Sequence, residues 1–335
     1  MFDSVSLSAA MSSFLTSERR QLLRVLLVIY GVIGFSSLFT LIHPRLRRPE
    51  ARRIRLAVTS WWYPALFGGV MVLCGGIGGV LCNAIISLGA LREFQRLLPE
   101  ADRHPLLDTL ALLAVPLYYG ALLIVGPAAA SSTLLFFGAA ALPALRIELR
   151  GHDGFLAASG RLLLGLLLCV FSLGFLSRIL LLRGTGAPAG AEGLVALLCI
   201  GVMVSDAFQY LSGKLFGRRA LAPRLSPKKT WEGFAGGILS AALSGALLGW
   251  IWTIAATPGS PIGFVAGLAL GAIAGVAGPA GDLGISMLKR QTGLKDAGDF
   301  LAGHGGVLDR IDSWLIAVPV CFYGVVLIEW LTRLH

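Results

Sequence analysis

The stretch PIGFVAGLALGAIAGVAGPAG, residues 261–281, has no charged side chain over its 21 positions. A helix needs about 20 predominantly apolar residues to cross the hydrocarbon core of a bilayer, so this run predicts one membrane-spanning helix. It ends directly before Asp282. The rest of the chain is similar, since 56% of its 335 residues are hydrophobic and only 14% are charged. Soluble proteins usually carry about 25% charged residues, so we expect an integral membrane protein.

Other apolar windows of similar length recur along the chain. The stretch 57–91 is longer than one span requires and is interrupted by four glycines, which favours a tight turn between two short spans over a single crossing. The sequence therefore predicts an all-α, polytopic membrane protein with about nine to ten transmembrane helices. The glycines are Gly75, Gly76, Gly78 and Gly79, and the windows are 22–43, 106–126, 128–145, 160–182, 191–213, 234–256, 261–281 and 314–332.

Charged residues gather in particular segments between these spans. If 57–91 crosses twice, the arginine-rich loop after the first span shares one side of the membrane with every later charged segment, and the positive-inside rule makes that side cytoplasmic. We therefore expect an integral protein of a bacterial inner membrane, with both chain ends outside and the active site facing the cytoplasm. The later charged segments are 92–104, 146–153, 214–230 and 282–312.

The net charge of +10 comes mainly from arginine in short loops. Such a distribution suits anionic lipid headgroups, and because no aromatic and basic nucleic-acid motif occurs, we expect no nucleic-acid partner. The five cysteines lie inside apolar runs without a CxxC pair, which favours buried free thiols over a zinc or disulfide role.

Acidic residues are concentrated at the end of the quoted stretch. Five of the 18 acids lie between residues 282 and 312. Asp309 and Asp312 are three residues apart at the expected start of the last helix, so their carboxylates should share a face. With Asp282 folded back against them, they could hold a hard divalent ion such as Mg²⁺ through oxygen ligands. The alternative is a solvated loop whose charges only orient the flanking helices.

Glycines accompany these acids in the sequence His304-Gly305-Gly306. Paired glycines are typical of backbone that adopts positive φ or approaches a ligand closely. A turn of this kind can present amide donors to phosphate.

Two further features lie outside the 282–312 segment. Lys228 and Lys229 occur in the segment SPKKTWEG, residues 226–233, just before an expected helix, where their charge would add to the helix dipole and form an anion site. An ordinary positive-inside loop is the alternative. Asp206 lies within the apolar run 191–213. A carboxylate inside a span is a functional candidate, with a structural hydrogen-bond network as the alternative.

The charged segment carries a recognisable pattern, which comprises Ser286, Lys289-Arg290, Lys295-Asp296, Gly298, His304-Gly305-Gly306, Asp309-Arg310 and Asp312. With this pattern the chain resembles the phosphatidate cytidylyltransferase (CDP-diacylglycerol synthase) family. Gly281-Asp282-Leu283 and the segment 226–233 match the family as well. Ala302 departs from the usual proline or glycine, and Gln209 departs from the usual alanine before Tyr210.

The resemblance implies transfer of cytidylate from CTP to phosphatidic acid, giving CDP-diacylglycerol and pyrophosphate in phospholipid biosynthesis. It divides the chain into an additional N-terminal membrane helix and basic loop, 1–50, and a cytidylyltransferase membrane domain, 51–335, with the catalytic half at about 200–335. The expected partners are CTP, phosphatidic acid and membrane lipids, and the expected cofactor is Mg²⁺. A second metal ion and a homodimer are left open.

The resemblance also implies roles for individual residues. We expect catalytic roles for Asp282, Asp309, Lys289, Asp296 and His304, and metal binding by Asp282, Asp309 and Asp312. Substrate binding is expected for Ser226, Lys228, Lys229, Thr230, Glu232, Ser286, Arg290, Lys295, Arg310 and Asp206.

Two alternatives to this function are kept. A CTP-dependent kinase of a polyprenol or phytol would transfer only the γ-phosphate, and labelled CTP distinguishes the two reactions. A transporter would use Asp206 and broken helices as a permeation path, but inverted repeats are not visible and the charge lies on one face.

Overall fold

The computed structural model describes residues 17–43, 55, 58–59, 61–151, 153–182, 190–256, 263–293, 297–298 and 305–333. Within this part of the chain, nine helices are long and apolar enough to cross a membrane. The predicted all-α polytopic fold is confirmed. The helices of the first half are α2 (Ser17–Ile42), α4 (Trp62–Arg96), α5 (Pro105–Ile124), α6 (Pro127–Phe136), α7 (Leu142–Arg150), α8 (Phe155–Leu166) and α9 (Leu173–Leu180).

The second half contains α10 (Gly190–Phe216), α11 (Trp231–Ala256), α12 (Phe264–Gln291), the short α13 (Leu308–Ile311) and α14 (Trp314–Arg333). Helices α10, α11 and α12 pack side by side, and α14 packs against α12. Small residues allow the closest of these contacts, as at Gly245 of α11, where a Cβ atom would overlap the backbone carbonyl of Gly267 on α12. Such close backbone approach is typical of helix packing in lipid.

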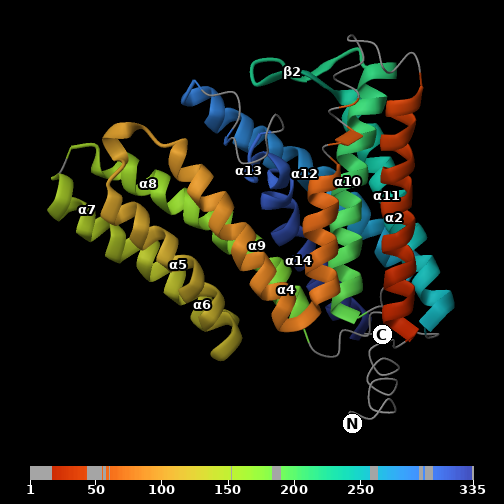
Figure 1. Ribbon diagram of the computed structural model, residues 1–335, viewed down its shortest axis with the longest axis horizontal. Helices are drawn as coiled ribbons and strands as arrows, with labels where there is room; N and C mark the ends of the chain where they lie inside the picture. Colours follow the sequence, from red (N-terminus) through yellow and green to blue (C-terminus); the bar gives the residue numbers. More distant parts are fainter. Residues whose placement is uncertain are drawn as a thin grey trace.

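Helix α4 bends sharply at two of the predicted glycines. Gly75 has φ of 53° and Gly76 has φ of 34°, both outside helical geometry. These values are accessible to glycine because it has no Cβ atom. Figure 1 shows the two arms of α4 diverging from this bend. The predicted tight turn is confirmed, whereas crossing of the bilayer by each arm stays a prediction.

The two arms of α4 connect the halves of the molecule. The first arm contacts α10, where Gly68 lies against Cys199, and the second arm contacts α9, where Gly79 lies against Leu180. Figure 1 shows α5, α6, α7 and α8 on the outer side of the second arm. The buried core is continuous across this junction and includes Phe94 of α4 and Tyr118 of α5.

A β-hairpin interrupts the helices at the end of α10, where the sequence indicated only a polar loop. Strand β1 (Ala220–Ala222) pairs antiparallel with β2 (Ser226–Thr230). The hairpin projects beyond the ends of α10 and α11 (Figure 1). Hydropathy gives no signal for it, because its two strands are only three and five residues long.

Candidate active site

Three predicted site residues lie on one face of α12. Asp282, Ser286 and Lys289 are separated by four and three residues, which places their side chains above one another on a helix. The Ser286 hydroxyl donates to Asp282 Oδ1 over 3.2 Å. The polar segment expected from residue 282 is therefore helical as far as Gln291. The apolar run therefore ends before the helix does.

Asp282 also forms an ion pair with the hairpin. The Lys229 ammonium nitrogen lies 2.5 Å from Asp282 Oδ2, with the lysine side chain 15% exposed and the carboxylate side chain 31% exposed. Close packing of α11 on α12 brings the end of β2 to this position. Of the two neighbouring lysines in the predicted anion site, Lys229 faces the acids and Lys228 is exposed.

Lys289 pairs with Asp309 in a second ion pair. The ammonium nitrogen lies 2.6 Å from Asp309 Oδ1, and the aspartate side chain is only 8% exposed. Asp309 Oδ2 accepts hydrogen bonds from the backbone amides of Ala297 and Gly306, over 2.8 and 3.0 Å. Both oxygens of Asp309 are therefore occupied by donors within the protein, and the residue ties α12 to the turn that precedes α13.

Asp282 also belongs to a group of three carboxylates, together with Asp206 and Asp312. Asp312 lies within electrostatic range of Asp206 and Asp282, and the Ser313 hydroxyl donates a hydrogen bond to Asp206. Gly281 makes this approach possible, because a Cβ atom there would overlap the backbone carbonyl of Asp312. The acids come from α10, α12 and the junction of α13 with α14, so only the folded chain brings them together.

Glu93 is a site residue that sequence reasoning missed. It lies near the end of α4, is 4% exposed, and accepts hydrogen bonds from the amides of Val307 and Leu308 over 2.9 and 2.8 Å. Its carboxylate lies so close to Gly306 that a Cβ atom there would overlap it. The predicted turn with positive φ is present at Gly305, where φ is 81°. Within this turn the Gly306 amide donates to Asp309, and the next two amides, of Val307 and Leu308, donate to Glu93.

The hairpin and the start of α11 are held together by two predicted site residues. Thr230 Oγ1 accepts a hydrogen bond from the Gly233 amide over 3.1 Å, which caps α11. Glu232 accepts from the backbone amides of Arg218 and Arg219 over 2.9 and 3.2 Å. These bonds fix the position of Lys229, whereas a direct role of Glu232 in substrate binding stays a prediction.

The structure thus brings together Asp206, Asp282, Asp312, Lys229, Lys289 and Asp309. Arg290 is exposed at the end of α12, Arg310 lies on α13, and Ser226 begins β2. The predicted site residues Lys295, Asp296 and His304 lie outside the described residues, as does Ala302.

Among the described residues, no three His, Cys, Asp or Glu side chains converge closely enough to enclose a metal ion on their own. Mg²⁺ does not need such a cage, since it is usually held by one or two carboxylates together with substrate phosphates. The four carboxylates and two lysines of the site leave an excess of two negative charges when all are ionised. Buried charge of this sign is stabilised by a divalent cation, so the donor set fits Mg²⁺ bound together with a phosphate ligand.

Comparison with known proteins identifies relatives of the chain. The model of the cytidylyltransferase family matches residues 53–328. This match includes every element of the site described above, from Glu93 of α4 to Asp312. Helix α2 precedes the matched residues.

Individual relatives cover most of the chain. Phosphatidate cytidylyltransferase of Pseudomonas aeruginosa is 36% identical over 266 residues, which are 77% of this chain and 90% of the relative. The Brucella abortus protein of the same name is 35% identical over 256 residues, covering 76% and 87% of the two chains. The "uncharacterized protein YnbB" of Escherichia coli is 31% identical over 284 residues, covering 83% and 90%.

Proposed function

Since the chain belongs to the cytidylyltransferase family and is therefore a nucleotidyltransferase, we propose that it uses CTP and phosphatidate to form CDP-diacylglycerol and pyrophosphate. The likeness to phosphatidate cytidylyltransferases of Pseudomonas aeruginosa and Brucella abortus, over about three quarters of the chain, supports this acceptor. The observation that carries the mechanism is the mixed acidic and basic cluster at the C-terminal end of α12.

In the proposed reaction, an oxygen of the lipid phosphate attacks the α-phosphorus of CTP. The new P–O bond forms as the bond between the α-phosphorus and the bridging oxygen breaks, and pyrophosphate leaves with the electron pair. The attacking oxygen is already ionised near neutral pH, so the site needs no strong general base. Positioning and neutralisation of charge are the dominant contributions to such transfers.

The two lysines are positioned to meet phosphate oxygens. Lys229 and Lys289 are each paired with one aspartate in the structure, at 2.5 and 2.6 Å. We propose that they exchange these carboxylate partners for oxygens of the triphosphate when the nucleotide binds. Their side chains are each 15% exposed, so a short movement brings the ammonium groups to a bound ligand.

Asp282 and Asp312 are the carboxylates that we propose as Mg²⁺ ligands, with Asp206 as a nearby acid that adds negative charge. When bound, Mg²⁺ would polarise the phosphate oxygens and neutralise charge on the leaving pyrophosphate. Asp282 is 31% exposed and, among the described residues, is bonded only to the side chains of Lys229 and Ser286. Asp309 was predicted to bind metal too, but it is 8% exposed and its Oδ2 is held by the backbone amides of Ala297 and Gly306. We propose that it positions Lys289 and the turn at Gly306 instead.

We place the site on the cytoplasmic face of a bacterial inner membrane, because CTP is a cytoplasmic nucleotide and the positive-inside rule gives the same orientation. The function is tested by following two labels of CTP with the purified protein. A label in the cytosine ring should enter the lipid if cytidylate is transferred. A kinase of polyprenol or phytol would leave that label in free CDP and transfer only the γ-phosphate.

A further inference from the structure

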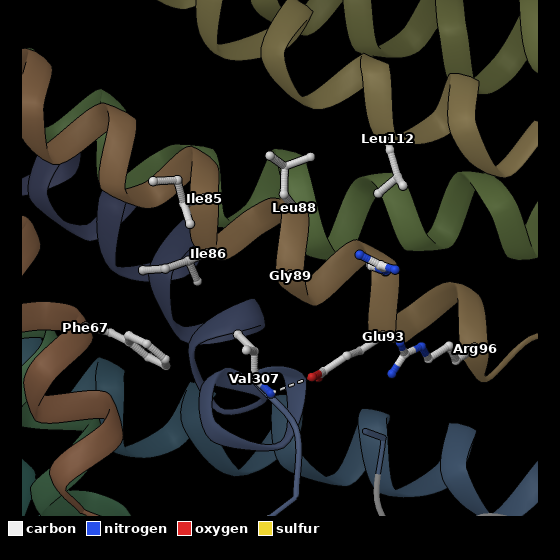
Figure 2. A pocket seen from close by; sticks show the side chains of 10 residues that line it. Phe67, Ile85, Ile86, Leu88, Gly89, Glu93, Arg96, Leu112 and Val307 are labelled. Carbon is white, nitrogen blue, oxygen red and sulfur yellow. Dashed lines mark hydrogen bonds between the residues drawn. The ribbon is translucent and has the colours of Figure 1, made fainter. Parts of the chain in front are cut away.

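A groove runs beside the second arm of α4 and reaches the turn before α13. It encloses a cavity of about 570 Å³. Its walls are mainly apolar and come from three parts of the fold, with Ile85 and Leu88 on the second arm, Phe67 on the first arm and Leu112 on α5. Figure 2 shows these side chains around the groove, with Val307 on the side of the turn that precedes α13.

The exposed face of this arm changes from apolar to basic along its length. Ile77, Leu81 and Ile85 are 64%, 53% and 69% exposed and recur at intervals of four residues. Arg92 and Arg96 continue the same face and are exposed. At about 1.5 Å per residue, the helix rises about 22 Å from Ile77 to Arg92. This length exceeds the thickness of one leaflet, about 15 Å, so the face can lie along one acyl chain over its full depth.

A second, polar hollow of about 440 Å³ adjoins the groove and shares Arg92, Arg96 and Leu112 with it. Arg103 and Asp108 also line this hollow, so positive charge is in excess. The side chains of Arg92 and Arg96 form no hydrogen bond or ion pair with a described residue. Glu93, which lies between them in the chain, is directed at the amides of Val307 and Leu308 and forms no ion pair with either arginine. The basic end is therefore available to an anion.

We propose that this groove binds the phosphatidate substrate, with one acyl chain along Ile85, Leu88 and Leu112 and the phosphate at Arg92 and Arg96. The inference rests on the proposed function. The joining of an apolar channel to exposed arginines matches an anionic lipid, since guanidinium groups bind phosphate through paired hydrogen bonds. A free nucleotide would leave the apolar length of the groove without a partner.

The groove also contacts the turn that precedes α13. Val307 forms part of its wall, and the Val307 amide is held by Glu93. Asp309, which pairs with Lys289, follows only two residues later. A lipid in the groove would therefore contact the same short segment that positions Lys289. Its phosphate would approach the site from the side of α4.

The first test compares the two substrates kinetically. In mixed micelles, the double variant Arg92→Ala, Arg96→Ala should raise the KM for phosphatidate by about tenfold or more, because charge-assisted hydrogen bonds to phosphate are lost. The KM for CTP should stay within about twofold, as expected for a contact that the nucleotide does not make. Leu88→Trp, which fills the groove, should also raise the KM for phosphatidate. Arg24→Ala and Leu38→Trp, both at exposed positions of α2, are matched controls.

The second test does not depend on turnover. Phosphatidate with a photoreactive group in one acyl chain should label peptides that contain Ile85, Leu88 or Leu112, and the double arginine variant should lose this labelling. Labelling elsewhere, or equal labelling of the double variant, overturns the groove as the lipid site, as does an unchanged KM for phosphatidate. A chain that transfers cytidylate normally but fails these tests keeps the proposed function and loses only the groove. Cross-links between two copies through this face would show a protein interface instead.

Discussion

The carboxylate of Glu93 accepts a 2.9 Å hydrogen bond from the backbone amide of Val307, 214 residues later in the chain. A second bond, to the Leu308 amide, makes the carboxylate a two-point anchor for the turn before α13. This turn leads directly to Asp309, so α4 of the first half fixes the position of a residue in the second half.

We therefore predict that Glu93→Ala lowers kcat by about tenfold to a hundredfold, because two buried amides lose their acceptors at about 1–3 kcal/mol each. Glu93→Gln should retain part of the activity, since its amide oxygen still accepts one bond. The KM for CTP should change less than kcat, as expected for a residue that positions others. Exposed Glu148 on α7 provides the control variant Glu148→Gln. Normal turnover by Glu93→Ala would rule out the anchoring role.

The acids should separate into two classes when Mg²⁺ is titrated. Asp282→Asn and Asp312→Asn should raise the Mg²⁺ concentration required for half-maximal activity and lower the maximal rate, because a carboxylate ligand is lost. Asp309→Asn should lower the rate without this shift, since its oxygens bind Lys289 and two amides. Activity against Mg²⁺ concentration measures both effects. An equal Mg²⁺ shift in all three variants would instead make Asp309 a ligand, as the sequence pattern first indicated.

Gly281 and Gly284 on α12 form a matched pair of positions. A Cβ atom at Gly281 would overlap the Asp312 carbonyl, whereas one at Gly284 would meet no atom within 4 Å. Gly281→Ala should therefore destabilise the protein by about 1–3 kcal/mol through overpacking and move Asp312 out of place. Gly284→Ala should be neutral or stabilising by up to about 1 kcal/mol, as is typical of this change in a helix. Thermal unfolding in detergent and turnover should both separate the two variants. Equal thermal stability and turnover of the two variants would contradict the close contact between Gly281 and the Asp312 carbonyl.

Lys289 should contribute to the binding of CTP. Lys289→Met removes the ammonium group 2.6 Å from Asp309 and should raise the KM for CTP by about tenfold, the effect of losing one charge-assisted hydrogen bond. Lys229→Met should act similarly from the hairpin. Exposed Lys214 on α10 supplies the control variant Lys214→Met. Initial rates at varied CTP concentrations measure the effect, and an unchanged KM for CTP in both variants would remove the lysines from the triphosphate site.

The amino-acid pattern predicted the membrane fold well because hydropathy reports contact with lipid directly. Its windows 234–256 and 314–332 lie within α11 and α14, and the glycines at 75 and 76 marked the bend in α4. The end of α12 was placed ten residues too early, at 281 instead of Gln291. Polar residues such as Asp282 and Lys289 end an apolar run without ending a helix.

The site was predicted only in part. The chemistry of Asp282, Lys229 and Lys289 could be inferred from the residue types, but their pairing could not, because it depends on where the hairpin and α13 lie relative to α12. Glu93 was missed, since its partners are backbone amides more than 200 residues away and every residue has an amide. Its one indication was an acid between two arginines at the end of a span.

The central claim is tested most directly by incubating the purified protein with phosphatidate, Mg²⁺ and CTP labelled at the α-phosphorus, and then measuring labelled lipid and pyrophosphate together. The account predicts label in CDP-diacylglycerol with one pyrophosphate released for each lipid formed, and loss of both products in Asp282→Asn protein that is still inserted in the membrane. An unlabelled lipid product with CDP in place of pyrophosphate, or unchanged turnover by Asp282→Asn, would contradict it.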